Sequence, residues 1–256
     1  MVSPALLEVR GLHQRFGGVV ALDGLDVTVA EGKITALIGP NGAGKTTAFQ
    51  CISGVARADA GNVRFAGHDV TSWRPDRITR AGMVRSFQVA RGIPRLSVME
   101  NLMLYAPHQP GERVGTALLG SGRQAEEAAR AAAASVARRL GLLKLGNAPA
   151  ASLSGGQKKL LEIGRALMAM PRMILLDEPV AGVNPTLAEE IAHHLRALRD
   201  EGMTFLVIEH HMDMVAQLCD PVVVMAEGRV LTEGSFAQVA ADPAVQEAYM
   251  GRRRWS

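Results

Sequence analysis

Residues 39–46 read Gly-Pro-Asn-Gly-Ala-Gly-Lys-Thr, a pattern that suits phosphate binding because it fits G-x-x-x-x-G-K-S/T without a gap. Glycines let the backbone curl so that successive N–H groups point at phosphate oxygens, and the helix expected next adds the positive end of its dipole. The Lys45 ammonium would reach the β- and γ-phosphates, and the Thr46 hydroxyl would ligate Mg²⁺. The alternative is a glycine-rich turn between a strand and a helix. The expected nucleotide contacts of this phosphate loop are Gly39, Pro40, Asn41, Gly42, Ala43, Gly44, Lys45, Thr46 and Thr47.

Two carboxylates end an apolar run later in the chain. Residues 173–176 are fully apolar, and Asp177 and Glu178 follow them. A buried strand delivers such side chains to the carboxyl edge of a parallel sheet, where ligands of α/β folds bind. There Asp177 would hold hydrated Mg²⁺, and Glu178 would orient or deprotonate an attacking water beside the γ-phosphate. Taken alone, the pattern also fits a strand that ends in solvated acids.

A second anion site is predicted where Leu-Ser-Gly-Gly-Gln precedes a helix. Ser154 is a natural N-cap, and the two glycines after it leave the first N–H groups of the helix open to an anion. The alternative is an ordinary capped helix. The residues of this expected site are Ser154, Gly155, Gly156 and Gln157.

These side chains need a scaffold, and the hydrophobic pattern predicts one of alternating strands and helices. That alternation indicates an α/β fold with a mostly parallel sheet, and the helical stretch at about 90–155 reads as an insertion into it. Expected strands lie at 7–11, 25–29, 34–38, 63–65, 83–89, 173–176 and 204–208, and a hairpin at 222–225 and 230–232 with a turn at 227–228. Expected helices lie at 45–53, 97–104, 124–140, 156–170, 186–199, 211–219 and 235–250, with a loop or broken helix at 106–122.

Composition narrows the classes of function. The chain has 256 residues, 48% of them apolar and 21% charged, which excludes intrinsic disorder. A net charge of +3 with six Phe, two Trp and two Tyr does not indicate nucleic-acid binding. Two cysteines exclude a disulfide framework and favour a reducing compartment. No apolar run is long enough to span a bilayer and no secretion signal is evident, so we expect a cytoplasmic protein that meets a membrane through a partner.

The order of the motifs closely resembles that of the ATP-binding subunits of ABC transporters. The phosphate loop, LSGGQ, ILLDEP and a lone histidine after a buried strand follow one another as in that family, over essentially the whole chain. The resemblance implies a single ABC ATPase domain over 1–256, with a RecA-like core and an N-terminal antiparallel β subdomain. It also implies a helical subdomain inserted at about 90–155 and a C-terminal helical extension with a basic tail at 235–256.

The resemblance assigns roles to further residues. Gln88 matches the loop glutamine that contacts Mg²⁺ and bridges to the transmembrane partner, and His210 matches the switch histidine that contacts the γ-phosphate. Phe16, 29 residues before Lys45, stands where the family has the aromatic that stacks on adenine, although a core aromatic is the alternative. In the family two subunits pair head to tail, so that the serine and glycines at 154–156 of one close over ATP held by the other.

The sequence departs from the family pattern at two positions. Asn184 stands where most members have Asp, which leaves open how the paired sites are coupled, and His211 replaces the acid that follows the switch histidine. A metal site at His210 and His211 is rejected because no Cys or carboxylate set completes it. His193 and His194 are expected on a solvated helix face.

Several segments resemble the LivG-like branch of branched-chain amino acid importers, and Asn184 agrees with it. They are residues 85–88, 97–102, 181–185 and 242–251. That branch implies transmembrane permease subunits, a second ATPase subunit (identical or heterologous), an indirect solute-binding partner and a place on the cytoplasmic face of the membrane. Urea or amide import, lipopolysaccharide export and a soluble ABC ATPase without a membrane partner are the alternatives. The arginines at 252–254 fit a solvated tail or a contact with anionic lipid.

Overall fold

The computed structural model describes residues 4–86, 93–107 and 122–250, which contain two β-sheets. The smaller sheet is antiparallel, in the order β2-β1-β4-β5. The larger has the order β10-β9-β3-β8-β7-β6, and only β10 at its edge runs antiparallel. The fold predicted from the motif order is therefore confirmed.

The smaller sheet consists of β1 (Ala5–Phe16), β2 (Val19–Ala30), β4 (Ala60–Phe65) and β5 (His68–Asp69). The larger consists of β3 (Ile34–Ile38), β6 (Met83–Arg85), β7 (Met173–Asp177), β8 (Thr204–Ile208), β9 (Val222–Ala226) and β10 (Arg229–Gly234).

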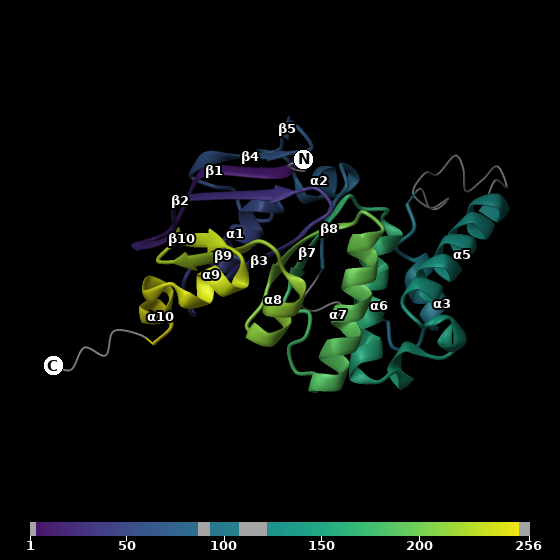
Figure 1. The fold of residues 1–256 in the computed structure, drawn as a ribbon. Helices are drawn as coiled ribbons and strands as arrows, with labels where there is room; N and C mark the ends of the chain where they lie inside the picture. Colours follow the sequence, from purple (N-terminus) through teal and green to yellow (C-terminus); the bar gives the residue numbers. More distant parts are fainter. Residues whose placement is uncertain (1–3, 87–92, 108–121, 251–256) are drawn as a thin grey trace.

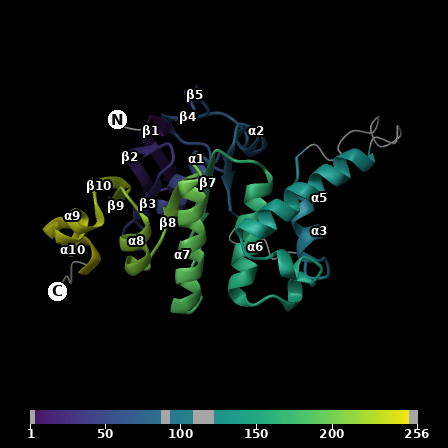
Figure 2. The ribbon, with the colours of Figure 1, turned by 45° about the vertical axis from the view of Figure 1, so that its right-hand side comes forward.

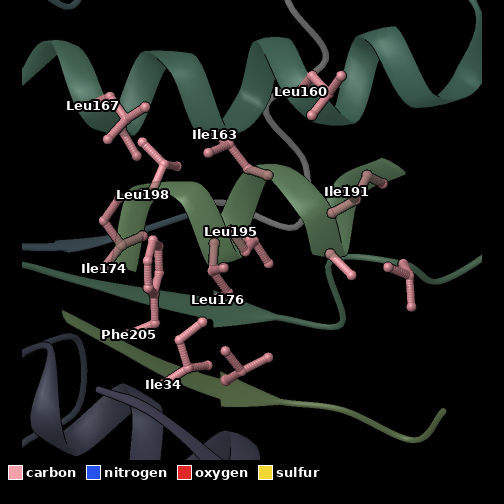
Figure 3. Close-up of a cluster of buried hydrophobic side chains, with 14 of the residues drawn as sticks. Ile34, Leu160, Ile163, Leu167, Ile174, Leu176, Ile191, Leu195, Leu198 and Phe205 are labelled. Atoms are coloured by element: carbon pink, nitrogen blue, oxygen red, sulfur yellow. The ribbon is translucent and has the colours of Figure 1, made fainter. Parts of the chain in front are cut away.

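Strands β3, β7 and β8 are buried at every position, because both faces of the larger sheet are covered. Alternate side chains enter two different cores. Leu37, Leu175 and Leu206 face a core shared with the smaller sheet and α1 (Lys45–Ile52). On the opposite face, Ile174 and Phe205 pack under α6 (Gly155–Met168) and α7 (Pro185–Asp200), whose apolar faces cover them (Figure 3). This sandwich fixes the carboxyl ends of the central strands at one edge.

Three helices pack together beyond the sheet: α3 (Val98–Met103), α5 (Gly122–Arg139) and α6. They approach closely at Gly164, where an added Cβ would lie 2.9 Å from Leu102 Cδ2 and 3.0 Å from Leu140 Cδ1. Two views show α3 and α5 at one end of the molecule and the C-terminal helices at the other (Figures 1 and 2). Short 3-10 turns at Leu143–Leu145 and Ala150–Ser152 connect α5 to α6.

The last part of the chain follows the prediction of a hairpin and helices. Strands β9 and β10 pair antiparallel around a turn at residues 227–228, and α9 (Phe236–Ala241) and α10 (Pro243–Met250) follow. Helix α8 (Met212–Leu218) precedes β9. In the part of the chain that is described, no helix combines the length and the apolar character needed to cross a membrane.

Several local features differ from the expectations. Strands β1 and β2 extend well beyond the expected 7–11 and 25–29, and β5 was not predicted. Helix α2 (Pro75–Arg80) was not predicted, because six residues with Ile78 as the buried one show no apolar period. The strand expected at 83–89 ends at Arg85, and residues 87–89 lie outside the described ranges. His194 is not simply solvated: its Nδ1 lies 3.1 Å from the backbone oxygen of Arg139 and ties α7 to the end of α5.

Candidate functional site

The phosphate loop connects β3 to α1 at the carboxyl edge of the larger sheet. Gly39, Gly42 and Gly44 all have positive φ, and Gly44 is the N-cap of α1. An added Cβ would lie 2.1 Å from the Met225 backbone oxygen at Gly39 and 2.3 Å from the Ala21 backbone oxygen at Gly44, so larger residues do not fit there. No side-chain hydrogen bond caps α1, and its own first turn carries no acidic residue, so the positive end of its dipole is not neutralised from within the helix.

The loop is held in place by the C-terminal hairpin. The N–H of Gly228 donates to the backbone oxygen of Ala43 at 3.0 Å. Helix α10 also reaches the loop: burial raises the pKa of the Tyr249 phenol, and a hydrogen bond from the backbone of Gly39 opposes that rise. The curled backbone of the loop is therefore braced from outside before any ligand binds.

The Lys45 side chain is buried within this loop. Its Nζ donates to the backbone oxygens of Gly39 at 2.7 Å and Pro40 at 3.0 Å. Burial lowers the pKa of the ammonium, and the nearby charges of Glu178 and Asp177 oppose that shift. The cation of the loop and the two acids are thus within electrostatic reach of one another.

Asp177 and Glu178 sit at the end of β7 in different surroundings. The Asp177 side chain is 2% exposed and accepts a hydrogen bond from Arg85 Nη2 at 3.2 Å. Burial raises the pKa of Asp177, and the guanidinium of Arg85 opposes the rise. Glu178 leaves the strand with a φ of 50°, a left-handed conformation that is strained for Glu. Its side chain is 37% exposed, so it is open to solvent where Asp177 is not.

His210 meets Glu178 directly. His210 Nε2 lies 3.1 Å from Glu178 Oε1, and both side chains are a little over one third exposed. The loops that carry them are also joined through the backbone, because the N–H of Glu178 donates to the oxygen of Ile208 at 2.9 Å. The structure thus brings together a carboxylate and an imidazole that are far apart in the sequence.

Two charged residues in this region were not identified from the sequence. One is Arg85, which pairs with Asp177, and the other is Glu209, which is 1% exposed. In the sequence, each is a charged residue at the end of an apolar strand, and this pattern could have marked both as candidates. Glu209 Oε1 accepts from the N–H of Val180, and its Oε2 accepts from the N–H groups of His210 and His211. Neither role can be assigned without knowing which loops lie side by side.

The Leu-Ser-Gly-Gly-Gln segment forms a capped helix start, as predicted. Ser154 is the N-cap of α6: its Oγ accepts from the N–H of Gln157 at 3.3 Å, and Gln157 Oε1 accepts from the N–H of Ser154 at 2.9 Å. Gly155 has open space around it, whereas Gly156 is buried against Leu187. Within the described residues, no hydrogen bond or ion pair joins this segment to the phosphate loop of the same chain.

The remaining expected site residues are placed as follows. Phe16 lies at the end of β1 opposite Val19 and is 52% exposed, so it is not a core aromatic. Thr46 is exposed in the first turn of α1. Gln88 lies outside the described residues, as do the arginines at 252–254. Asn184 caps α7 by accepting from the N–H of Leu187 at 2.9 Å.

Comparisons with known proteins agree with this geometry. Residues 22–181 match the family model described as "ABC transporter", and residues 229–254 match one described as "Branched-chain amino acid ATP-binding cassette transporter". The chain is 39% identical over 246 residues to a protein of Archaeoglobus fulgidus named "Probable branched-chain amino acid transport ATP-binding protein LivG", covering 96% of this chain and 95% of that protein. It is 36% identical over 254 residues to "High-affinity branched-chain amino acid transport ATP-binding protein LivG" of Escherichia coli (strain K12), covering 98% and 99%.

Solved structures give the same result. A nucleotide-free ATP-binding cassette from an ABC transporter superposes with a TM-score of 0.85 at 38% identity, covering 97% of this chain and 100% of that one. The ADP conformation of an ATP-binding cassette of an ABC transporter gives a TM-score of 0.85 at 37% identity, with the same coverage. The chain therefore belongs to the family of ABC transporter ATP-binding proteins and is of the branched-chain amino acid (LivG) type.

Proposed function

We propose that this chain powers the import of branched-chain amino acids by hydrolysing ATP at a site that it shares with a second ATPase subunit. The observation that carries the hydrolytic part is the 3.1 Å approach of His210 to Glu178, beside the loop that holds Lys45. The match of residues 229–254 to the family of branched-chain amino acid ATP-binding cassette transporters supports branched-chain amino acids as the transported substrate.

The phosphates of ATP would bind where the backbone already presents donors. N–H groups of the phosphate loop and of the first turn of α1 would contact the β- and γ-phosphates, and Lys45 would exchange its carbonyl partners for phosphate oxygens. Phe16 would stack on adenine, since its ring is exposed at the end of β1.

A magnesium ion fits the donors at the edge of the sheet. The Thr46 hydroxyl and the Asp177 carboxylate are hard oxygen donors of the kind that Mg²⁺ prefers, and Gln88 is proposed as a further contact. Bound there, Mg²⁺ would neutralise charge on the phosphates. Arg85 keeps a positive charge beside Asp177, which favours the ionised form that a cation needs.

Hydrolysis needs a base and a group that holds it in place. Glu178 would accept a proton from a water whose oxygen attacks the γ-phosphorus, while the bond to the oxygen bridging to the β-phosphate breaks and leaves ADP and inorganic phosphate. His210 would orient Glu178 and contact the γ-phosphate. Glu178→Gln should retain ATP binding and lose about 10²–10⁴-fold in turnover, the usual range for a general base.

A second ATPase subunit, identical or related, would complete the site. The exposed Ser154 and Gly155 at the start of α6 would close over ATP that the partner's phosphate loop holds, because a helix N-terminus attracts anions. ATP favours the closed pair and ADP does not, and that difference in affinity drives opening.

The helical region at about 90–155 would transmit this motion to transmembrane permease subunits. An apolar cavity of about 810 Å³ lies among α3, α5 and the end of α6, lined by Met103, Leu104, Met168 and Met170 among others. Leu104 and Met170 are exposed at this cavity, and exposed apolar surface is typical of a protein contact. The chain would lie on the cytoplasmic face of the membrane through the permease, and a solute-binding protein would act on the far side.

Transport in proteoliposomes tests this function. The complex that co-purifies with the full-length chain is reconstituted with its solute-binding protein, and uptake of labelled leucine, isoleucine and valine is measured with ATP on the cassette side. We expect uptake with the wild-type chain and none with Glu178→Gln. ATP-dependent uptake of urea or amides instead, extraction of lipopolysaccharide, or co-purification with ribosomes or DNA in place of a permease would contradict the proposal.

A further inference from the structure

Glu209 is a buried carboxylate at the junction of the two loops that carry Glu178 and His210. It directly follows β8 and is 1% exposed. Among the described residues, no Lys or Arg pairs with it, and its partners are backbone N–H groups and one imidazole. The N–H of Val180 donates to Oε1 at 3.2 Å, and those of His210 and His211 donate to Oε2 at 2.6 and 3.0 Å. His211 Nδ1 lies 3.2 Å from Oε2.

These donors come from both sides of the site. Val180 belongs to the loop that follows Glu178, whereas His210 and His211 belong to the loop after β8. One carboxylate oxygen therefore holds the first loop and the other oxygen holds the second. A buried carboxylate is tolerated only when donors satisfy it, so this arrangement ties the two loops together at a fixed spacing.

The conformation of Glu178 shows that its loop has to be held. Its φ of 50° lies in the left-handed region, which a residue other than glycine occupies only when its surroundings enforce it. Two contacts do so: the N–H of Glu178 donates to Ile208, and the N–H of Val180, two residues later, donates to Glu209.

We propose that Glu209 is a positioning residue for ATP hydrolysis, whose two carboxylate oxygens set the approach of His210 to Glu178. The proposal rests on the roles of Glu178 and His210 under the proposed function. Gln at this position has nearly the same shape but offers one acceptor oxygen and an NH₂ group. The NH₂ would face N–H donors on one of the two loops, so Glu209→Gln should separate them.

His211 supplies a matched control within the same cluster. Its imidazole contacts Glu209 but is 54% exposed, and the three backbone donors remain when it is removed. His211→Ala should therefore keep the loops joined. Glu201→Gln is a second control, because Glu201 is an exposed carboxylate that pairs with Arg139 away from the site.

Steady-state kinetics of the full-length chain gives the first test. We expect Glu209→Gln to lower kcat for ATP at least tenfold with KM changed less than twofold, and both controls to stay within twofold of wild type in both constants. Equal losses in kcat and ATP affinity, or wild-type turnover in a folded Glu209→Gln chain, would overturn the proposal. If thermal melting shows that this variant is unfolded at the assay temperature, Glu209→Asp takes its place. That variant keeps the charge but is too short to reach both loops, and the same outcomes apply.

The ¹⁵N signals of the His210 imidazole give a second test that does not depend on turnover. Glu178→Gln alters the direct partner of His210 Nε2, so it defines the shift that marks a lost contact. Glu209→Gln should shift the same signal in the same direction, while Glu201→Gln should not. An unmoved signal in Glu209→Gln would refute the positioning role. Wild-type turnover in Glu178→Gln would instead refute the proposed function, and the two failures are thereby distinguished.

Discussion

A Cβ atom added to Gly156 would lie 2.0 Å from Cδ1 of Leu187 and 2.4 Å from its Cγ. Leu187 is in the first turn of α7, where its N–H is held by the Asn184 side chain. Gly156, which the sequence predicts to leave helix N–H groups open to an anion, is therefore also needed for close packing against Leu187. It lets the start of α6 lie directly against the start of α7, which follows the loop of Glu178.

Gly156→Ala should destabilise the chain, because the new methyl group must displace a branched side chain at a close helix contact. Overpacking of this kind costs about 1–3 kcal/mol. Gly155→Ala is the matched control: its added methyl group meets nothing within 4 Å, so its stability should stay within about 0.5 kcal/mol of wild type. Urea unfolding of the isolated chains measures both, and equal stabilities for the two variants would show that the contact with Leu187 is not tight.

Phe16→Ala should weaken ATP binding without unfolding the chain. Stacking of a base on an aromatic ring contributes about 1–3 kcal/mol, or about 5- to 150-fold in affinity, and the exposed Phe16 ring has little packing to lose. Calorimetric titration with ATP and with inorganic triphosphate separates the base from the phosphates. We expect a loss for ATP alone. The same loss with triphosphate, or none with ATP, would remove Phe16 from the adenine site, and Val19→Ala serves as the control on the paired strand.

Asp177→Asn should change how stability depends on pH. Burial raises the pKa of Asp177 in the folded chain above its ordinary value, so the folded state holds this proton more tightly than the unfolded state. The ionised carboxylate therefore costs stability once the pH exceeds the ordinary aspartate pKa of about 4. Asn removes that cost, so its unfolding free energy relative to wild type should increase from pH 4 to pH 7. A difference that stays constant or shrinks over this range would show that folding does not raise the pKa of the Asp177 carboxyl.

Asn101→Ala should destabilise the helical region. The Asn101 amide is 1% exposed; its Nδ2 donates to the backbone oxygens of Ile93, Leu96 and Ser97, and its Oδ1 accepts from Ile93 and Arg165. Removing the amide breaks these bonds, although each of the three carbonyls keeps a backbone N–H donor, and a lost hydrogen bond typically costs about 0.5–1.5 kcal/mol. Ser152→Ala removes a single exposed hydrogen bond and should be nearly neutral. Urea unfolding, followed by far-ultraviolet circular dichroism, measures the free energy of unfolding of both variants. Equal values for Asn101→Ala and Ser152→Ala would show that the Asn101 amide does not stabilise the helical region.

Much of the scaffold could be predicted because its signals are local. Strands β3 and β8 occupy the predicted residues, since each is an apolar run with polar or turn residues on both sides. The phosphate loop and the helix cap at Ser154 follow from residue types a few positions apart. Such features depend on backbone geometry that neighbouring residues determine.

What could not be predicted depends on contacts between distant segments. Glu209 bonds the N–H of Val180, 29 residues earlier, and Arg85 meets Asp177 across 92 residues. Their charge at a strand end was visible, but their partners depend on which strands are neighbours in the sheet. The packing role of Gly156 likewise requires Leu187, which only the arrangement of α6 against α7 brings close.

Under the proposed function, each ATP lies between Lys45 of one subunit and Ser154 of another. Mixing two inactive full-length variants, Lys45→Ala and Ser154→Arg, tests this arrangement. In a mixed pair, one site receives an intact lysine from one chain and an intact serine from the other, so the mixture should regain ATPase activity that neither variant has alone. A mixture as inactive as its components, or full activity of Ser154→Arg as a monomer, would contradict the arrangement.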